Sequence, residues 1–496
     1  MKFFRLFVTC VLVWSSAFAQ SENLAEKSAQ ARDMMAAGKF TEAAVIYREL
    51  IRQVPDNPGL LLNLGMALQM AGDDRGSIPH LQAAAKFDPK LAPAWLFLGN
   101  AYLHLGRTAP AIDALRTVLR LQPDHQSART LLAGVLLSLD RATEAAAQYR
   151  KLTEADSANS AAWYGLGRSY ESLAVREFSA LNQLGQDSAF WLILTAEAKL
   201  RDQQLSSAFY LYRRALEKAP NMHGLHAALA GIYRQTEHPE WAAIEEEKER
   251  QLAPLNCSTQ KLECAWNDAR YEVLLAPTTT MNSSESHFWA ARTCNQLALQ
   301  AFVRLEKLPP SSEQHEVKAQ ILNRQKRYSE AANEWKAALN FSPDNPEFLE
   351  QLAINLKLSQ DYAAALPLFQ KLLQKHSTSA ELNYLVGDTL LDLQRPEDAI
   401  PYLERSLQHS PKSLPTHKSL ARANLAIGED AAAIPHLKLA LPTDHDGSLH
   451  FQLAQAYRAT GQPELGTRLL ADYQRMQASR AAESQSTQEE LQITPP

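Results

Sequence analysis

The sequence has 496 residues, of which 46% are hydrophobic and 21% charged, a globular composition that excludes disorder over most of the chain. Its 50 Lys and Arg against 55 Asp and Glu give a net charge of −5, so no basic excess is available for a nucleic-acid partner. Only 18 residues are glycine, about half of the usual ~7% share, and this favours helices over tight turns.

The N-terminus predicts a secretory signal peptide over residues 1–19. Lys2 and Arg5 precede the apolar stretch 6–14, and an A-x-A cleavage pattern ends at Ala19. That stretch is shorter than the ~20 residues that cross a bilayer. We therefore expect an exported protein of Gram-negative type, periplasmic or secreted, with no integral membrane segment after cleavage. The alternative is an uncleaved N-terminal anchor.

Three cysteines remain after cleavage. Cys257 and Cys264 are seven residues apart and could close a small disulfide loop, as an oxidising compartment would allow. Cys294 would then be a free, buried thiol. Three cysteines without clustered histidines do not make a zinc site, and we expect neither a metal nor a cofactor.

A period of 34 residues runs through the chain after the signal. The clearest unit, residues 92–125, carries its pattern at positions 4, 7, 8, 11, 20, 24 and 32: Trp95, Leu98, Gly99, Tyr102, Ala111, Leu115 and Pro123. Positions 4, 7, 8 and 11 lie on one face of a first helix, here helix A. Small residues at positions 8 and 20 let a second helix, B, approach closely, and proline at position 32 ends helix B.

This pattern resembles the tetratricopeptide repeat, and the resemblance covers nearly all of the chain after the signal. It implies an all-α fold, a right-handed α-solenoid of about 11–13 helix pairs. The units in this frame are 24–57, 58–91, 92–125, 126–159, 189–222, 223–256, 312–345, 346–379, 380–413, 414–446 and 447–480.

The same frame divides the chain into regions. They are an N-terminal array over 24–159, a shortened repeat with further repeats over 160–256, degenerate cysteine-containing repeats over 257–311, a C-terminal array over 312–480, and a polar tail over 481–496 that we expect to be disordered. The segments that follow Trp163 and Trp289 resemble each other and lack the usual A–B turn. We expect each to merge helices A and B into one long helix.

No catalytic motif is present: the sequence has no H-E-x-x-H, no G-x-S-x-G and no phosphate loop with its lysine. Asp444, His445, Asp446 and His450 cluster in sequence, but they fall in a turn between repeats, where polar residues are ordinary. We therefore expect no enzyme.

In the family that the pattern resembles, positions 2, 5, 9, 12 and 13 of helix A line a groove that binds partners. Carried over to this chain, they predict a mostly apolar, methionine-containing peptide-binding groove in the N-terminal half, made of Leu62, Met66, Met70, Leu96, Asn100, Leu103 and Leu137. The alternative is that these side chains pack on neighbouring repeats. Some members clamp a carboxylate with lysine at position 5, but Leu96 stands there, so such a clamp is not supported.

The same positions in the C-terminal half are charged. They include Glu347, Glu350, Lys357, Glu381, Tyr384, Asp388, Asp392, Lys418 and Arg422. We interpret them as a solvated face, with a second, charged partner region as the alternative.

Two functional hypotheses follow. The first is a non-catalytic protein–protein interaction scaffold of the bacterial envelope that binds a peptide or helix of an unidentified protein in its groove. The alternative is an accessory protein of polysaccharide export or cell-wall assembly that contacts glycan. Aromatic side chains exposed along the groove would favour the second hypothesis, and core-packed Trp and Tyr would count against it.

Overall fold

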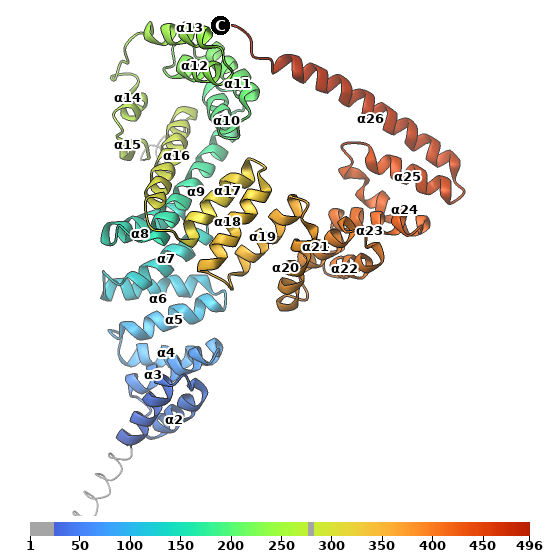
Figure 1. Cartoon of the computed structure of the whole chain (residues 1–496). Helices are drawn as coiled ribbons and strands as arrows, with labels where there is room; N and C mark the ends of the chain where they lie inside the picture. The colour runs from blue at the N-terminus through green and yellow to red at the C-terminus, as the bar shows by residue number, and fades with distance from the viewer. Residues whose placement is uncertain (1–23, 276–281) are drawn as a thin grey trace, which may run out of the picture. The chain divides into compact units, whose positions relative to one another are not determined.

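The computed structural model describes residues 24–275 and 282–496, which are helical with irregular connections and contain no strand (Figure 1). The predicted signal peptide lies outside the described residues. The chain divides into two compact units, one built from residues up to Leu173 together with 297–301, the other from 174–296 and 302–496. Each of the eleven predicted units appears as an A–B helix pair, so the predicted all-α repeat fold is confirmed.

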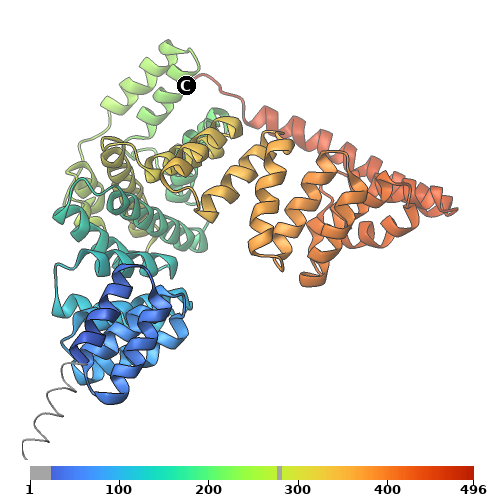
Figure 2. The same cartoon turned by 60° about the horizontal axis from the view of Figure 1, so that its bottom comes forward.

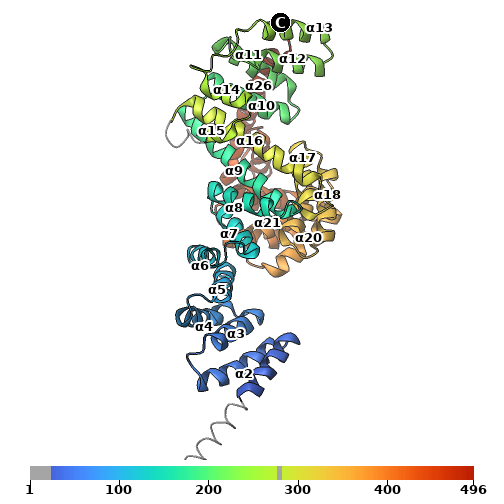
Figure 3. The same cartoon turned by 90° about the vertical axis from the view of Figure 1, so that its left-hand side faces the viewer.

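In the first unit, helices stack in chain order (Figures 1 and 3). After a helix over residues 24–36 come α2 (Phe40–Gln53), α3 (Pro58–Met70), α4 (Asp74–Phe87), α5 (Ala92–His104), α6 (Thr108–Leu121), α7 (Gln126–Ser138), α8 (Ala142–Ala155) and the first part of α9 (Ser160–Leu184). The odd-numbered helices from α3 to α7 are A helices, and α3 also contacts α5 directly.

In the second unit, A–B pairs flank a less regular middle part. The pairs are α10 (Ala189–Arg201) with α11 (Leu205–Lys218), α12 (Leu225–Gln235) with α13 (Pro239–Arg250), α17 (Ser312–Arg324) with α18 (Tyr328–Phe341), α19 (Pro346–Leu358) with α20 (Tyr362–Lys375), α21 (Ala380–Asp392) with α22 (Pro396–His409), α23 (Leu414–Ala426) with α24 (Asp430–Ala440), and α25 (Ser448–Ala459) with α26 (Pro463–Glu490) (Figure 2). The middle part contains α14 (Lys261–Asn267), α15 (Tyr271–Leu275) and α16 (Ser284–Glu306).

The two merged repeats are present as single long helices. Helix α9 has 25 residues and α16 has 23, against 13 or 14 for the helices of an ordinary pair such as α3 and α4. The prediction of merged helices is therefore confirmed. No described helix has the length and apolarity that a bilayer crossing would require.

Every A–B turn contains one residue in the left-handed conformation, at position 15. In the eleven units these residues are Gly38, Gly72, Gly106, Asp140, Gln203, Glu237, Lys326, Gln360, Gln394, Gly428 and Gly461, with φ between +56° and +86°. Ala269, between α14 and α15, has φ +54°, so the degenerate segment keeps the same turn. Several of these residues carry a side chain although glycine is favoured there.

The small residue at position 8 is required by the close approach of helices A and B. A Cβ at Gly65 would lie 2.5 Å from Leu81, and a Cβ at Gly387 would lie 2.7 Å from Leu403. Both leucines stand at position 24 of helix B. Gly165 is explained by a different close approach, to the B helix of the preceding repeat, because its Cβ would meet the ring of Tyr149 on α8. It is a packing residue.

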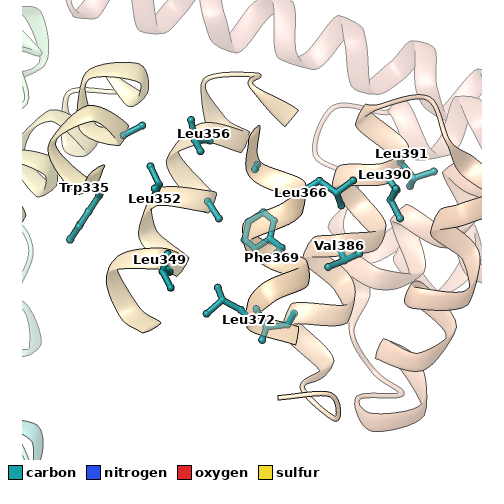
Figure 4. Packing of buried hydrophobic residues seen from close by; sticks show 14 of the residues in the cluster. Trp335, Leu349, Leu352, Leu356, Leu366, Phe369, Leu372, Val386, Leu390 and Leu391 are labelled. Atoms are coloured by element: carbon teal, nitrogen blue, oxygen red, sulfur yellow. The ribbon is translucent and has the colours of Figure 1, made fainter. Parts of the chain in front are cut away.

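The core is a series of interlocked clusters along the stack. In the C-terminal pairs, Phe369 of α20 is fully buried and its ring lies between leucines of α19 and Val386 of α21 (Figure 4). Trp335 of α18 is buried in the same cluster. Each helix pair thus buries its apolar face only with its neighbours, as in other stacked repeats.

Position 4 of helix A carries a polar link that the family pattern alone does not predict. The side chain donates a hydrogen bond to the carbonyl at position 32 of the preceding repeat: Trp95 to Pro89 (3.1 Å), Trp163 to Ser157 (2.9 Å), Asn383 to Ser377 (3.2 Å) and His417 to Pro411 (3.1 Å). In several repeats it also contacts position 23 of its own helix B: Arg129 with Gln148 (2.8 Å), His226 with Glu245 (2.5 Å), His315 with Glu334 (2.7 Å) and His417 with His436 (2.9 Å).

The C-terminal residues differ from the prediction of a disordered tail. Helix α26 continues to Glu490, because residues 481–490 hold helix formers such as Ala, Glu and Gln and contain neither glycine nor proline. After it, the last six residues pack against another part of the same unit through Ile493 and Thr494.

Candidate functional site

The A helices α3, α5 and α7 carry the predicted groove residues. Met70 is 50% exposed, and the side chains of Met66, Leu96, Asn100, Leu103 and Leu137 are half-buried. These six residues are called the helix-A surface below. Leu62, in contrast, is 9% exposed and belongs to a buried cluster with Leu61 and Ile78, so it packs against neighbouring helices and offers a partner little contact.

Polar contacts hold neighbouring repeats together beside the helix-A surface. Gln69 Nε2 of α3 donates to the Phe97 carbonyl of α5 (3.3 Å). At the end of α5, His104 Nδ1 contacts the Asp74 carboxylate at 3.1 Å. The first bond joins the successive A helices α3 and α5, and the second joins α5 to the preceding B helix α4.

A pocket that sequence reasoning missed lies on the other side of α5, between α4 and α6. Its volume is about 510 Å³, and its lining residues are Gln82, Ala85, Lys86, Trp95, Leu98, Tyr102, Pro110, Asp113, Ala114 and Thr117. Tyr102 is 5% exposed, and its Oη accepts a hydrogen bond from Gln82 Nε2 (2.8 Å). The pattern identified Trp95 and Tyr102 as core residues, but the alanines on the two B helices leave the space beside them open.

The C-terminal A helices carry a network of charges, not a solvated face. Lys357 Nζ of α19 lies 2.8 Å from Asp388 Oδ2 and 2.6 Å from Asp392 Oδ2, both on α21. Arg422 of α23 lies 2.7 Å from Asp392 Oδ1, and Ser419 Oγ donates to Asp388 (2.7 Å). The Lys357, Asp388 and Asp392 side chains are only 14–19% exposed. The interpretation as a solvated face is wrong for these residues, because long side chains on successive A helices reach one another.

Burial and pairing act on these charges in opposite directions. Burial alone would lower the pKa of Lys357, but the nearby Asp388 and Asp392 carboxylates more than offset it, and this pKa is raised. Burial would raise the pKa of Asp388, but the Lys357 ammonium offsets it and the pKa of the carboxyl is lowered. The network is therefore held in its ionised form near neutral pH.

Next to the network is a second pocket of about 440 Å³. Its lining residues are Tyr384, Asp388, Leu414, Pro415, Lys418, Ser419, Arg422 and Thr443. Burial, and then the Asp388 charge, raise the pKa of Tyr384, so its phenol stays protonated at physiological pH. Most of the charges around this pocket are already paired with one another.

The cysteines are arranged as a bridge and a buried thiol. Cys257 and Cys264 form a disulfide across the start of α14, next to Trp266, which packs against Trp289 of α16. Cys294 is buried, and burial, followed by the nearby Glu177 charge, raises its pKa to about 12. A thiol with such a pKa is not a nucleophile at neutral pH.

Among the described residues, no group of three or more His, Cys, Asp or Glu is arranged to hold a metal ion. The sequence cluster around Asp444 closes a turn: its Oδ2 accepts from the backbone N–H of His450 (2.8 Å) and contacts the His450 Nδ1 atom (2.6 Å). This carboxylate oxygen is thus used in the fold.

Models of the tetratricopeptide repeat match the chain in two stretches. One matches residues 28–92, 75–125, 96–160, 130–174 and 352–413, and a second matches residues 390–456. Together they span 28–174 and 352–456, about half of the chain.

Similar curated proteins match only in part. Superkiller complex protein 3 of Mus musculus is 29% identical over 157 residues, 31% of this chain and 10% of that protein. The probable UDP-N-acetylglucosamine–peptide N-acetylglucosaminyltransferase SPINDLY of Hordeum vulgare is 28% identical over 142 residues, 27% of this chain and 15% of that protein. Small glutamine-rich tetratricopeptide repeat-containing protein 2 of Mycosarcoma maydis is 27% identical over 115 residues, 23% of this chain and 32% of that protein. The chain thus spans less than a third of the length of each.

Similar solved structures include MamA from Desulfovibrio magneticus RS-1, with 20% identity, a TM-score of 0.32, and coverage of 34% of this chain and 96% of that one. A repeat protein from Parabacteroides merdae has 14% identity, a TM-score of 0.32, and coverage of 67% of this chain and 98% of that one.

Proposed function

Since this chain belongs to the tetratricopeptide repeat family, we propose that its N-terminal repeats hold a segment of a partner protein against the helix-A surface. The chain is a protein–protein interaction scaffold. What is proposed beyond that is the place of binding and the kind of segment bound.

The row of partly uncovered apolar side chains on α3, α5 and α7 is the observation that carries the proposal. Met66, Leu96, Leu103 and Leu137 are half-buried, and Met70 is half-exposed. Removing this remaining apolar area from water stabilises a complex by roughly 25 cal/mol per Å² before the costs of association. The two methionines adapt to differently shaped partners because their unbranched side chains change rotamer easily.

The partner segment that fits best is an amphipathic helix or an apolar peptide. The helix-A surface carries no charged residue among its six members, so a charged segment would lose hydration without gaining a partner. Asn100 provides a polar group in the middle of the row, where it can select for a hydrogen-bonding group on the ligand.

Binding without catalysis is part of the proposal. The match to the barley transferase covers 15% of that protein, so its transferase activity is not carried over to this chain. Among the described residues, the one thiol outside the disulfide, Cys294, is buried and protonated at neutral pH, which is consistent with a binding role.

We propose that the scaffold acts at the bacterial envelope, in the periplasm or outside the cell. The signal-peptide pattern of residues 1–19 supports export. The bridge between Cys257 and Cys264 also supports it, because such bridges persist in oxidising compartments.

The glycan alternative receives less support. Trp335 is buried, and Trp95 and Trp163 are half-buried with their indole N–H groups bonded to backbone carbonyls. Sugars stack on exposed aromatic faces, whereas Trp335 is packed into the core and Trp95, which borders the pocket beside Tyr102, is held to the repeat by its indole N–H.

Affinity capture with residues 20–496 from an envelope extract, followed by measurement of the affinity of the recovered partner, tests the proposal. The double variant Met66→Asp with Met70→Asp should weaken that affinity at least about tenfold, equivalent to 1.4 kcal/mol. The matched control is Val175→Asp, because Val175 is 65% exposed on α9. Equal affinity of the wild type and the double variant, with unchanged circular dichroism, would rule the helix-A surface out.

A further inference from the structure

The last six residues, 491–496, lie against an A–B pair far away in the sequence. Tyr233 Oη of α12 donates a hydrogen bond to the Thr494 carbonyl oxygen (2.7 Å) across 261 residues of sequence. Ile493 is partly buried against the core cluster that includes Tyr233, and Trp241 packs against the same cluster. The C-terminus accordingly ends beside α12 and α13 in all three views (Figures 1, 2 and 3). Both partners belong to the second unit.

The surface that receives the segment is aromatic. Tyr233 is fully buried, its ring lies 5.5 Å from Phe209 of α11, and the edge-to-face contact with Trp241 of α13 is 5.6 Å. Burial raises the pKa of the Tyr233 phenol, so the hydroxyl remains a donor at neutral pH. A single hydrogen-bond donor surrounded by aromatic rings is suited to bind a main-chain carbonyl group that lies next to an aliphatic side chain.

Tyrosine recurs at position 11, and its oxygen meets a donor on the preceding B helix, which for Tyr233 is Arg213. The Oη atom of Tyr102 accepts from Gln82 (2.8 Å), and that of Tyr170 accepts from Arg150 (2.7 Å). In both cases the donor stands on the preceding B helix. The preceding B helix thus donates a hydrogen bond to the phenol oxygen. At Tyr233 the phenol hydroxyl in turn donates its hydrogen to the segment 491–496.

Residues 491–496 are attached to this surface by few contacts, as a bound ligand would be. Gln492, Thr494 and Pro495 are exposed and Leu491, Ile493 and Pro496 are only partly buried, so the segment is attached to its surface by partly buried side chains and the hydrogen bond from Tyr233. Contacts of that kind are weak between separate molecules. Here the segment is joined to its site through α26, and a tether that reaches the site raises the effective concentration of the segment above that of a free peptide.

We propose that the surface of α12 and α13 around Tyr233 is a binding site for an extended peptide segment with a branched aliphatic side chain, and that residues 491–496 occupy it as a tethered ligand. A partner segment of the same chemistry binds there by displacing them. This site is separate from the helix-A surface, and its test does not depend on the function proposed above.

The probe is a fluorescein-labelled synthetic peptide with the sequence of residues 487–496, titrated into the mature full chain and followed by anisotropy. The substitution Ile493→Asp removes the aliphatic anchor of the tethered segment and leaves the site itself unchanged. We expect the peptide to bind at least fivefold more tightly to this variant than to the wild type. The same peptide carrying aspartate in place of its isoleucine should not bind either protein.

Two variants made in the Ile493→Asp chain locate the site. Tyr233→Phe removes the donor and should weaken peptide binding severalfold. Tyr457→Phe is the matched control, since Tyr457 is another buried tyrosine at position 11, and it should leave binding unchanged. Amide hydrogen exchange at residues 491–494 should be slower in the wild type than in the Ile493→Asp chain.

Equal peptide affinity for the wild type and the Ile493→Asp chain would overturn the proposal, as would absence of binding to the Ile493→Asp chain. Equal exchange at residues 491–494 in both proteins would overturn the occupation of the site by the tethered segment. A loss of binding in Tyr233→Phe counts only if its thermal midpoint matches that of Tyr457→Phe. If it does not, Trp241→Leu replaces it as the site variant.

Discussion

The Nδ1 atoms of His417 and His436 lie 2.9 Å apart, and Nε2 of His417 lies 3.1 Å from the Pro411 carbonyl oxygen. A carbonyl only accepts, so Nε2 of His417 carries a hydrogen. In the neutral pair, Nδ1 of His417 must therefore accept the hydrogen of His436 Nδ1. Two doubly protonated rings cannot coexist in this geometry, since both would donate across the same gap.

This pair predicts that acid weakens the C-terminal repeats. Burial, and then the neighbouring His417, lower the pKa of His436, whereas an unfolded histidine titrates near 6.5. Below about pH 6.5 the unfolded chain binds the extra proton more readily, so the contribution of His436 to stability, complete above that pH, falls as pH falls through this range.

The substitution His436→Glu should reverse this contribution. It places a carboxylate opposite His417, as Glu334 stands 2.7 Å from His315, and a nearby carboxylate favours the charged form of an imidazole. We expect the difference in urea midpoint between His436→Glu and the wild type to move in favour of the variant between pH 7.5 and pH 5.5. A difference that stays constant or moves the other way over this interval would contradict the assigned proton positions.

The charge network predicts a large cost for removing its cation. Lys357→Met leaves Asp388 and Asp392 without their shared ammonium, and Asp388 is largely buried. Loss of one member of such a group costs about 2–3 kcal/mol when burial is partial. Urea unfolding of the variant and of the wild type at pH 7 measures this loss of stability.

The companion variants test the electrostatic origin of that cost. Adding Asp388→Asn and Asp392→Asn to Lys357→Met should recover part of the lost stability, because no unpaired charge remains. In the wild type the lowered pKa of Asp388 provides stability above about pH 4, and this is lost as pH falls through the lowered pKa. A deficit in Lys357→Met that does not shrink between pH 7 and pH 5 would indicate a packing defect.

The left-handed turns predict sites of stabilisation. Lys326 has φ +61°, a conformation that costs a residue with a side chain about 1–2 kcal/mol. Lys326→Gly should therefore stabilise the chain by about 0.5–1 kcal/mol after the entropy of the unfolded glycine is included. The matched control is Gln325→Gly, because Gln325 has φ −78° and glycine there should bring no gain. The thermal unfolding midpoints of the two variants, each compared with that of the wild type, test this prediction.

The disulfide predicts local stabilisation of the degenerate segment. Closing the short loop between Cys257 and Cys264 contributes about 2 kcal/mol through the unfolded state. Adding a reductant should accelerate amide hydrogen exchange in α14 and α15. The Cys257→Ser, Cys264→Ser chain should exchange rapidly with or without the reductant. Equal exchange of the reduced and oxidised wild type would contradict this role.

The repeat frame could be predicted from the sequence because its residues act locally. Gly65 and Leu81 are 16 positions apart, and the spacing alone places them on facing helices. The pairing of position 4 with position 23 could not be predicted in this way, since it depends on how helix A crosses helix B. The ends of Lys357 and Asp388 meet across successive A helices, and periodicity places only their backbones.

The candidate binding surfaces could likewise be predicted from the sequence only where they depend on repeat positions. Met66 of α3 and Leu103 of α5 are half-buried, in agreement with their expected place on an A helix. Leu62, also on α3, instead belongs to a buried cluster with Ile78 of α4. The contact between Tyr233 and Thr494 spans 261 residues and has no sequence pattern. The pocket beside Tyr102 arises from small side chains on two B helices, a combination that repeat positions do not specify.

The links at position 4 also bear on how such an array changes length during evolution. His417 bonds backward to Pro411 and across to His436, so one side chain joins the end of one repeat to the second helix of the next. Duplication or loss of a whole repeat keeps both distances in register, whereas an indel between Pro411 and His436 would move at least one of the bonded groups. Selection for these bonds therefore favours growth and shrinkage in whole repeats, even where the repeats have diverged in every exposed residue.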